Sequence, residues 1–278
     1  MNLFFIFGGS VNNKRIGIFD SGLGGLTVVK EIMKIMPNEG IVYLGDTARY
    51  PYGTKTKETI IRFSAENTEF LLKKDVKLII AACNTASAAA LPYLKKNFNI
   101  EMMGVIDSGA RIAAQTTAKG RVGVIGTRAT IASGAYEKAL AKAAPRIKVF
   151  TKATPLLAPL VEEGWINKKE TKMIVKDYLS FFGKSGIDTL VLGCTHYPLL
   201  KGVIAGVMPG VKIIDSAGAA AKEARSILAS KGMNASKNNR VKTAFYVTDT
   251  PDTFNKLGKM FLKKNMVYAK KTAVGKRG

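Results

Sequence analysis

The sequence predicts an α/β protein with two similar lobes, each a mainly parallel sheet flanked by helices. Short apolar runs alternate with amphipathic stretches along most of the 278 residues, a rhythm typical of parallel sheets covered by helices on both faces. A weak internal repeat indicates the two lobes. The segment 122–127 (VGVIGT) echoes 16–21 (IGIFDS), and the segment 191–196 (VLGCTH) echoes 80–85 (IAACNT).

The elements of the first lobe follow from apolar spacing. A helix is expected from Leu26 to Met36, where apolar residues keep helical spacing until Pro37 ends the run. The same spacing at Ile60 and Leu71 predicts a second helix. Four short apolar runs bounded by turn residues predict buried strands: Ile16–Asp20, Ile41–Gly45, Leu78–Ala81 and Met102–Ile106.

The second lobe repeats this rhythm. Four further apolar runs predict strands: Val122–Gly126, Lys148–Phe150, Thr189–Leu192 and Lys212–Ile214. Helical spacing predicts three helices, at about Ala129–Ala144, Lys168–Phe182 and Ala217–Ala229. Residues 244–278 then predict one more strand and helix followed by a basic run, and this tail could return to the sheet of the first lobe.

These elements divide the chain into two lobes. We expect residues 1–107 and 217–278 to form the first lobe and residues 108–216 the second. The strand exit Ile106–Gly109 is the one segment that resembles a linker, so we expect the lobes to pack closely. Met1–Asn13 resembles an N-terminal extension, because regular patterning starts only after it.

The composition narrows the class of protein. Apolar residues make up 47% and charged residues 23% of the chain, which excludes wholesale disorder. The 43 Lys and Arg outnumber the 20 Asp and Glu, giving a formal net charge of +23. This charge predicts affinity for anions. A nucleic-acid-binding protein is therefore one hypothesis, although the basic residues are scattered and no binding module is recognisable.

The cysteines and apolar runs indicate the compartment. Cys83 and Cys194 are too few for a disulfide framework, so we expect two free thiols in a reducing, cytoplasmic environment. The apolar run Leu3–Phe7 is shorter than the core of a secretion signal and follows no basic residue. No stretch approaches the ~20 apolar residues of a membrane span.

Both cysteines are predicted at the same topological place, directly after a buried strand and before a helix. Ligands of open α/β sheets bind at this edge, and helix N-termini lower the pKa of thiols. A single free cysteine is usually a buried small hydrophobe. Cys83 and Cys194 in matching positions of two repeats favour a function instead.

The neighbours of the cysteines are polar. Asn84 and Thr85 follow Cys83, and Thr195 and His196 follow Cys194. Such residues start helices and can also hold a carboxylate, so capping alone could explain Asn84. His196 is the only histidine of the chain and lies within reach of tuning the nearby thiol.

Three further segments contribute candidates. The turn after the first strand, 20–25 (DSGLGG), has the wrong glycine spacing for a dinucleotide site. Its Asp20 is as well explained by helix capping as by pairing with a proton-carrying group near Cys83. The loop 45–54 is rich in donors and follows a strand, where binding groups are common. Glu162 and Glu163 are adjacent acids beside an apolar run; one of them could face inward near Cys194, but the local pattern favours plain solvation.

Seven segments carry a family resemblance: Ile18–Gly25, Gly45–Thr47, Pro51–Gly53, Ala82–Ala86, Val124–Thr127, Pro159–Glu162 and Leu192–Pro198. In this order, and over nearly the whole chain, they resemble the glutamate racemases. The resemblance implies two α/β lobes that face each other across a buried active site, often in homodimers. It implies interconversion of L- and D-glutamate for peptidoglycan synthesis, with no cofactor and no metal.

The resemblance also implies roles for residues at matching positions. Cys83 and Cys194 would be the acid/base thiols, and Asp20, Glu162 and His196 their auxiliaries. The substrate-binding residues would be Asp20, Ser21, Tyr52, Gly53, Asn84, Thr85, Thr195 and His196. Glu162, and not Glu163, aligns with the single acid of the family. The N-terminal extension and the strongly basic charge are departures from the family.

Two thiols suit this chemistry for a physical reason. Inverting an α-carbon needs a base on one face and an acid on the other, and two similar lobes with one thiol each supply that arrangement. Modest environmental shifts bring thiol pKa values toward neutral pH, where general acid–base catalysis is most efficient. Racemisation of aspartate by the same two cysteines is the nearest alternative. A thiol oxidoreductase is less favoured, because the chain has no Cys-x-x-Cys motif.

Overall fold

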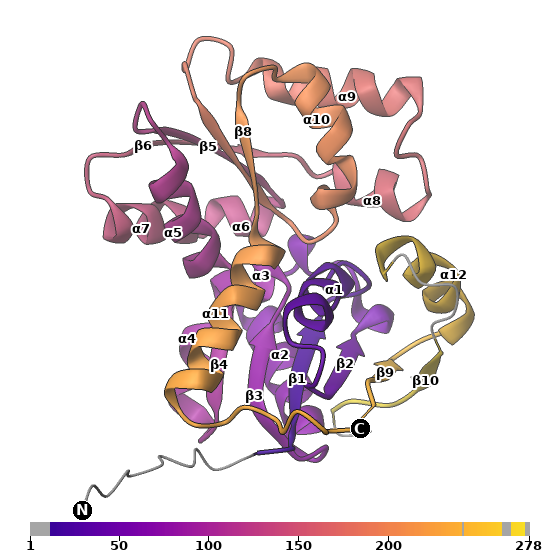
Figure 1. Cartoon of the computed structure of the whole chain (residues 1–278). Coiled ribbons are helices and arrows are strands. Elements are labelled where there is room, and N and C mark those ends of the chain that lie inside the picture. Colours follow the sequence, from indigo (N-terminus) through magenta and orange to yellow (C-terminus); the bar gives the residue numbers. More distant parts are fainter. Residues whose placement is uncertain (1–11, 241, 263–267, 276–278) are drawn as a thin grey trace, which may run out of the picture.

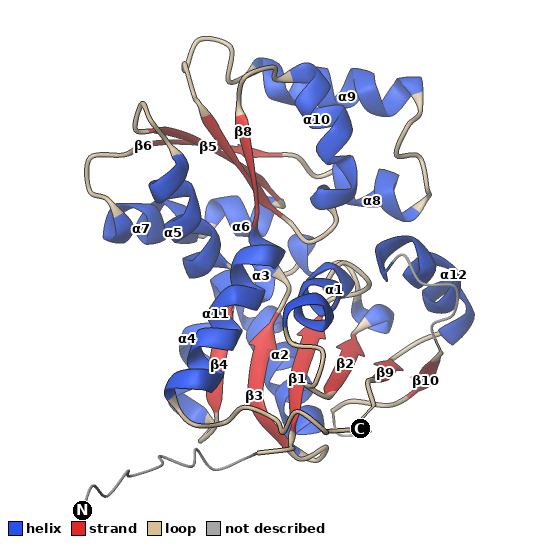
Figure 2. Cartoon of the chain, in the orientation of Figure 1, coloured by secondary structure: helices blue, strands red, loops and turns tan. Residues whose placement is uncertain are grey.

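The computed structural model describes residues 12–240, 242–262 and 268–275. Its strands form two sheets in which every described pair of neighbouring strands is parallel. The sheets lie one above the other in Figure 2, with helices around and between them. The predicted α/β class with two parallel sheets flanked by helices is confirmed.

The larger sheet has six strands in the order β10-β9-β2-β1-β3-β4. Its strands are β1 (Arg15–Asp20), β2 (Ile41–Gly45), β3 (Val76–Ala81), β4 (Glu101–Gly104), β9 (Ala244–Val247) and β10 (Ala269–Lys271). The helices and 3-10 turns between β1 and β4 are α1 (Leu26–Ile35), η1 (Thr47–Arg49), η2 (Tyr52–Thr54), α2 (Lys57–Leu72), α3 (Asn84–Ala89) and α4 (Leu91–Asn97). The tail adds α12 (Pro251–Leu262) between β9 and β10.

The smaller sheet has four strands in the order β6-β5-β7-β8. Its strands are β5 (Arg121–Gly126), β6 (Lys148–Ala153), β7 (Thr189–Gly193) and β8 (Lys212–Asp215). Its helices and turn are α5 (Ile106–Thr116), α6 (Arg128–Ala132), α7 (Ala135–Ala143), α8 (Leu157–Glu162), α9 (Lys169–Ser180), η3 (Tyr197–Leu200) and α10 (Lys201–Val207). Helix α11 (Ser216–Ser230) then descends from β8 along the larger sheet (Figure 1).

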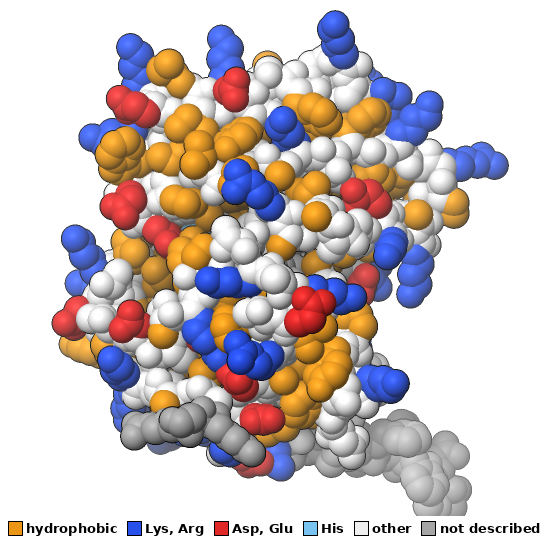
Figure 3. Space-filling view, turned by 180° about the vertical axis from the view of Figure 1, so that it is seen from behind, with side chains coloured by type: hydrophobic (Ala, Val, Ile, Leu, Met, Phe, Trp, Pro, Cys, Tyr) orange, Lys and Arg blue, Asp and Glu red, His pale blue; other side chains and the backbone are white. Residues whose placement is uncertain are grey.

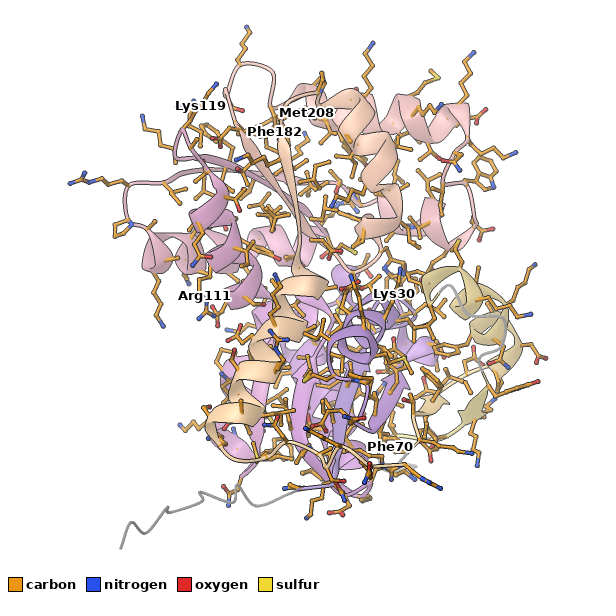
Figure 4. The ribbon with its side chains drawn as sticks, in the orientation of Figure 1. Lys30, Phe70, Arg111, Lys119, Phe182 and Met208 are labelled. Atoms are coloured by element: carbon orange, nitrogen blue, oxygen red, sulfur yellow. The ribbon has the colours of Figure 1, made fainter. Side chains whose placement is uncertain are left out.

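The central strands β1, β2, β3, β5 and β7 are buried on both faces, as expected for apolar strands of a parallel sheet covered by helices. Ile18 of β1 packs in the core that holds α1 and α11, whereas its neighbour Phe19 packs in the core that holds α2 and α4. Figure 4 places Phe70 within the six-stranded half and Phe182 within the four-stranded half. Arg111 of α5 pairs with Glu223 of α11 at 3.1 Å, where the two halves meet.

Several predicted elements differ in detail. The strand expected at Met102–Ile106 ends at Gly104, and the segment expected as a linker, Ile106–Gly109, is the first turn of α5. The helix expected at Ala129–Ala144 is two helices, because Gly134 takes the left-handed conformation (φ 62°) between them. The strand expected at Lys148–Phe150 runs on to Ala153.

The tail returns to the larger sheet, as the sequence allowed. Strand β9 pairs with β2, and a second tail strand, β10, which the sequence did not predict, pairs with β9. Most of the expected extension Met1–Asn13 lies outside the described residues. Its last residues, Asn12 and Asn13, contact the loop after α11, where Asn12 N–H donates to the Asn234 carbonyl at 3.1 Å. None of the described helices combines the length and apolar character needed to cross a membrane.

Candidate active site

Cys83 lies where β3 ends and α3 begins, as predicted. It is the N-cap residue of α3, and its side chain is buried. Its thiol donates to Ser21 Oγ across 3.6 Å. Because β1 and β3 are parallel neighbours, the turn after β1 comes beside the turn after β3. This pairing, and not sequence proximity, brings Ser21 to Cys83.

Cys194 directly follows β7 and is part of a chain of three ionisable groups. Its Sγ lies 3.7 Å from His196 Nδ1, and His196 Nε2 lies 2.9 Å from Glu162 Oε1. Glu162 ends α8, whereas Glu163 is exposed and caps that helix. The local pattern, which favoured solvation for both acids, was wrong for Glu162, because the apolar side of α8 turns it toward the histidine.

The two sulfur atoms have different electrostatic surroundings. Burial opposes a charge on His196, but its hydrogen bonds and charge interactions with Cys194 and Glu162 outweigh burial and raise its pKa to about 10. His196 is therefore an imidazolium at neutral pH beside the Cys194 sulfur. Burial, reinforced by the charge of Asp20, raises the pKa of Cys83 to about 12. Cys83 is therefore a thiol at the same pH.

Asp20 is fully buried at the end of β1 and connects the two halves. Its carboxylate accepts from the N–H of Gly22 at 2.8 Å and from the hydroxyl of Thr195 at 3.3 Å. Burial raises its pKa, and the charge of His196 partly offsets this effect. Gly24 makes the close approach possible, since a Cβ there would lie 2.1 Å from the Thr195 hydroxyl oxygen.

A cavity of about 350 Å³ lies between the two halves and includes both cysteines in its wall. Fourteen of its lining residues come from segments singled out in the sequence: Ser21, Tyr50, Pro51, Tyr52, Gly53, Thr54, Cys83, Asn84, Thr85, Thr127, Pro159, Cys194, Thr195 and His196. Asp20 and Glu162, by contrast, do not line the cavity; Asp20 contacts the lining residue Thr195, and Glu162 contacts the lining residues His196 and Tyr50. The two predicted thiols thus share one space of amino-acid size.

Two of the predicted binding residues differ in what they can offer a ligand. The hydroxyl of Tyr52 donates to Asp46, so its proton is already used. Asn84 Oδ1 accepts from the hydroxyl of Tyr136 at 2.7 Å, while Asn84 Nδ2 is buried with no hydrogen-bond partner among the described residues. An unsatisfied buried amide costs free energy, which a carboxylate acceptor in the cavity would recover.

The sequence did not single out several lining residues. They are Arg128, Pro155, Leu156, Ala158 and Tyr178. Arg128, the one arginine or lysine in this wall, had no usable signal, because a single basic residue in a chain of +23 stands out only once the cavity is known.

No group of His, Cys, Asp and Glu side chains suited to a metal ion occurs in the part of the chain that the structure describes. Both cysteines are free. A larger cavity of about 790 Å³ lies elsewhere, against α4 and α7, and neither cysteine lines it.

Comparison with known proteins identifies the family. The sequence profile of the Asp/Glu/Hydantoin racemase family matches residues 20–224. The glutamate racemase of Geobacter metallireducens is 49% identical over 250 residues, which cover 90% of this chain and 93% of that protein. The chain belongs to the glutamate racemase family.

Solved structures agree with this assignment. A glutamate racemase from Bacillus anthracis superposes with a TM-score of 0.91 at 40% identity, covering 94% of this chain and 98% of that one. The Francisella tularensis glutamate racemase, solved in complex with D-glutamate, has a TM-score of 0.87 at 42% identity, with the same coverage. The resemblance expected from the seven sequence segments is confirmed.

Proposed function

We propose that this protein interconverts L- and D-glutamate by taking the α-proton on one face of the substrate and returning a proton on the other. The observation that carries the proposal is the shared cavity, whose wall includes Cys83 from one half and Cys194 from the other. Membership in the glutamate racemase family supports glutamate over aspartate as the substrate.

The charges of the site assign starting roles to the two thiols. We assign Cys194 as the base, because its sulfur lies 3.7 Å from the His196 ring. The Cα–H bond breaks as this sulfur takes the proton, and the electron pair stays on Cα in conjugation with the carboxylate. The Cys83 thiol, whose pKa is raised to about 12, donates its proton to the opposite face. The resulting Cys83 thiolate is disfavoured by burial, which drives its reprotonation.

The developing carbanion needs hydrogen-bond donors aimed at the α-carboxylate. Asn84 is placed for this role, because its Nδ2 is an unsatisfied buried donor at the cavity wall. Thr85 and Thr195 add hydroxyl groups to the same wall. Thr195 is in turn held by Asp20. In this scheme Asp20 orients Thr195, Glu162 orients His196, and His196 places a positive charge beside Cys194.

The proposal also covers the cofactor requirement, the compartment and the oligomeric state. We propose that no cofactor or metal takes part, since the two thiols supply both acid and base. The product serves peptidoglycan synthesis in the cytoplasm, and the protein is a homodimer, as the family resemblance implies. Sedimentation equilibrium at micromolar concentration tests the dimer, and a single species at the monomer mass of 29.9 kDa contradicts it.

A decisive experiment follows the α-proton. Purified protein is incubated in D2O with L-glutamate and no added cofactor, while NMR records the loss of the α-proton signal and circular dichroism records the loss of optical activity. We expect both signals to decay, and aspartate to react far more slowly. Faster turnover of aspartate than of glutamate would support the aspartate racemase alternative.

The cysteine variants test the two-base mechanism. Cys83→Ala and Cys194→Ala should each abolish racemisation, because each removes the group on one face of Cα. Retention of most activity by either variant rules the mechanism out. Ser230→Ala, at the exposed end of α11, serves as the control and should react like the unaltered protein.

Weak, non-specific binding of nucleic acid is a proposed side activity that rests on the net charge of +23. Figure 3 shows basic side chains spread among acidic and apolar ones over both halves of one face, which suits weak contact with phosphates better than a defined groove. Binding to random duplex DNA should be measurable at low salt and fall steeply as salt is added. Absence of binding at low salt excludes this activity.

A further inference from the structure

A buried polar cluster lies behind the cavity wall and takes no part in the proposed proton transfers. We call it the Asp46 cluster; its members are Asp46, Arg49, Tyr52, Asn67 and Thr248. Asp46 follows β2 and is fully buried. The others come from the two 3-10 turns, from α2 and from the residue after β9, which lies beside β2 in the sheet (Figure 1).

The Asp46 carboxylate is the centre of this cluster. The Arg49 guanidinium donates to it, with its Nε 2.9 and 2.8 Å from the two oxygens. The Thr248 hydroxyl donates to Oδ1 at 3.0 Å, and the Tyr52 hydroxyl donates to Oδ2. Asn67 Nδ2 contacts both the Tyr52 oxygen (3.0 Å) and Asp46 Oδ2 (3.4 Å). Charge-assisted hydrogen bonds of this kind are stronger than neutral ones and rigidify their surroundings.

Tyr52 connects the cluster to the cavity. Tyr52 and its neighbours Gly53 and Thr54 line the cavity, but the Tyr52 hydroxyl points away from the cavity, toward Asp46. Burial and the charge of Asp46 raise the pKa of Tyr52, so it stays a neutral donor to that carboxylate. The phenol is therefore an anchor for the segment 52–54, and what the substrate meets is the ring and the backbone of this segment.

We propose that Asp46 is a positioning residue that holds the segment Tyr52–Thr54 in the geometry that binds the substrate. The proposal rests on the proposed function for the identity of the ligand. The Thr248 contact adds that the tail supports the site: its hydroxyl donates to Asp46 and accepts from the N–H of Ala48 at 2.9 Å. Strand β9 thereby braces a wall of the cavity from outside.

The test compares Asp46→Asn with a matched control, Asp188→Asn. Asp188 precedes β7 at the opposite end of the smaller sheet and accepts from Thr117 Oγ1 (2.5 Å), Ala118 N (2.7 Å) and Lys119 N (2.7 Å). Like Asp46, Asp188 stabilises a loop through its carboxylate, but none of these hydrogen-bond partners lines the cavity that holds the two cysteines. Asp46→Asn should raise the KM for glutamate about tenfold while changing kcat by less than threefold, the pattern expected when binding is lost equally in the ground state and the transition state. Asp188→Asn should leave KM unchanged.

A second readout is independent of the reaction. Amide hydrogen exchange of the segment 52–55, where Lys55 N–H is bonded to the Tyr52 carbonyl at 3.0 Å, should become at least tenfold faster in Asp46→Asn and unchanged in Asp188→Asn. Failure of the unaltered protein to racemise glutamate would refute the proposed function, while this exchange measurement would still decide the role of Asp46.

Thr248→Val covers the case in which Asp46→Asn does not fold. It removes one donor to Asp46 from the side away from the cavity, and we expect a smaller rise in KM together with faster exchange in segment 52–55. The proposal is overturned by an unchanged KM and exchange rate in Thr248→Val, or by equal effects of Asp46→Asn and Asp188→Asn on KM.

Discussion

His196 is the residue on which the charge of the site depends. Its side chain is 2% exposed and lies between the Cys194 sulfur and the Glu162 carboxylate. Cys194 is two residues away, so the sequence already indicated this contact, but Glu162 is 34 residues away. Only the packing of α8 against η3 brings the acid to the histidine.

The raised pKa of His196 makes a prediction for the dependence of stability on pH. Because its pKa is about 10 in the folded protein and 6.5 as the reference value, the charged form contributes stability that is complete below pH 6.5 and lost as pH rises through about 10. The difference in unfolding free energy between the unaltered protein and His196→Gln should therefore shrink from pH 6 to pH 10. Urea unfolding at pH 6, 8 and 10 measures it, and a pH-independent difference contradicts the assignment.

Arg128 makes a second prediction at this scale. It is an exposed cation at the cavity wall, where it attracts a substrate with two carboxylates. Arg128→Gln should raise KM several-fold and weaken the decline of kcat/KM with added salt. Arg225→Gln removes the same charge from the exposed side of α11 and should do neither. Equal effects of the two variants would show that only the net charge matters.

At the scale of elements, the strands were predicted closely and the helices less well. Strand positions follow from short apolar runs, which are local in sequence. The helices that follow Cys83 and Cys194 were predicted without bounds, whereas α4, α5 and α8 were not predicted, because α5 is rich in small or polar residues and α4 and α8 are short runs of seven and six residues. The break between α6 and α7 was missed for a similar reason, since apolar spacing continues through a single glycine.

That break supplies a prediction. Gly134 has a φ of 62° and no atom within 4 Å of a Cβ placed on it, so Gly134→Ala should destabilise the protein by about 1 kcal/mol through backbone conformation alone. Gly206→Ala is the control, because Gly206 lies inside α10 with equally open space. It should stabilise by about 0.5 kcal/mol. Chemical denaturation compares the two, and a destabilised Gly206→Ala would contradict the reasoning.

At the scale of the whole molecule, the site is closed by hydrogen bonds from one half to the other. Thr85 Oγ1 from α3 lies 2.9 Å from Thr127 Oγ1 and 3.1 Å from Thr130 Oγ1. The Tyr136 hydroxyl reaches Asn84 from α7. The cavity-lining residues Asn84, Thr85 and Thr127 thus also take part in the hydrogen bonds that link the halves. The expected boundaries of the lobes, at 107/108 and 216/217, stay a prediction.

Tyr136→Phe tests this link. Its hydroxyl is the described partner of Asn84 Oδ1, so its loss frees the Asn84 amide to turn and weakens its aim at the substrate. We expect a rise in KM and a fall in kcat, since the α-carboxylate carries more charge in the transition state. Tyr93→Phe, at an exposed residue of α4, should react like the unaltered protein. Unaltered kinetics in Tyr136→Phe would show that this hydrogen bond between the two halves does not affect catalysis.

The sequence by itself determined that two cysteines end buried strands in two repeated units and are followed by polar residues, because strands and turns are specified by neighbouring residues. It also determined the family, through seven ordered segments. The family resemblance implied a shared site and the choice of Glu162 over Glu163, but tertiary structure decided the contacts: both cysteines line one cavity, Glu162 reaches His196, and the Tyr52 hydroxyl turns to Asp46. These facts depend on how distant strands pair and helices pack, and such contacts leave no local periodicity in the chain.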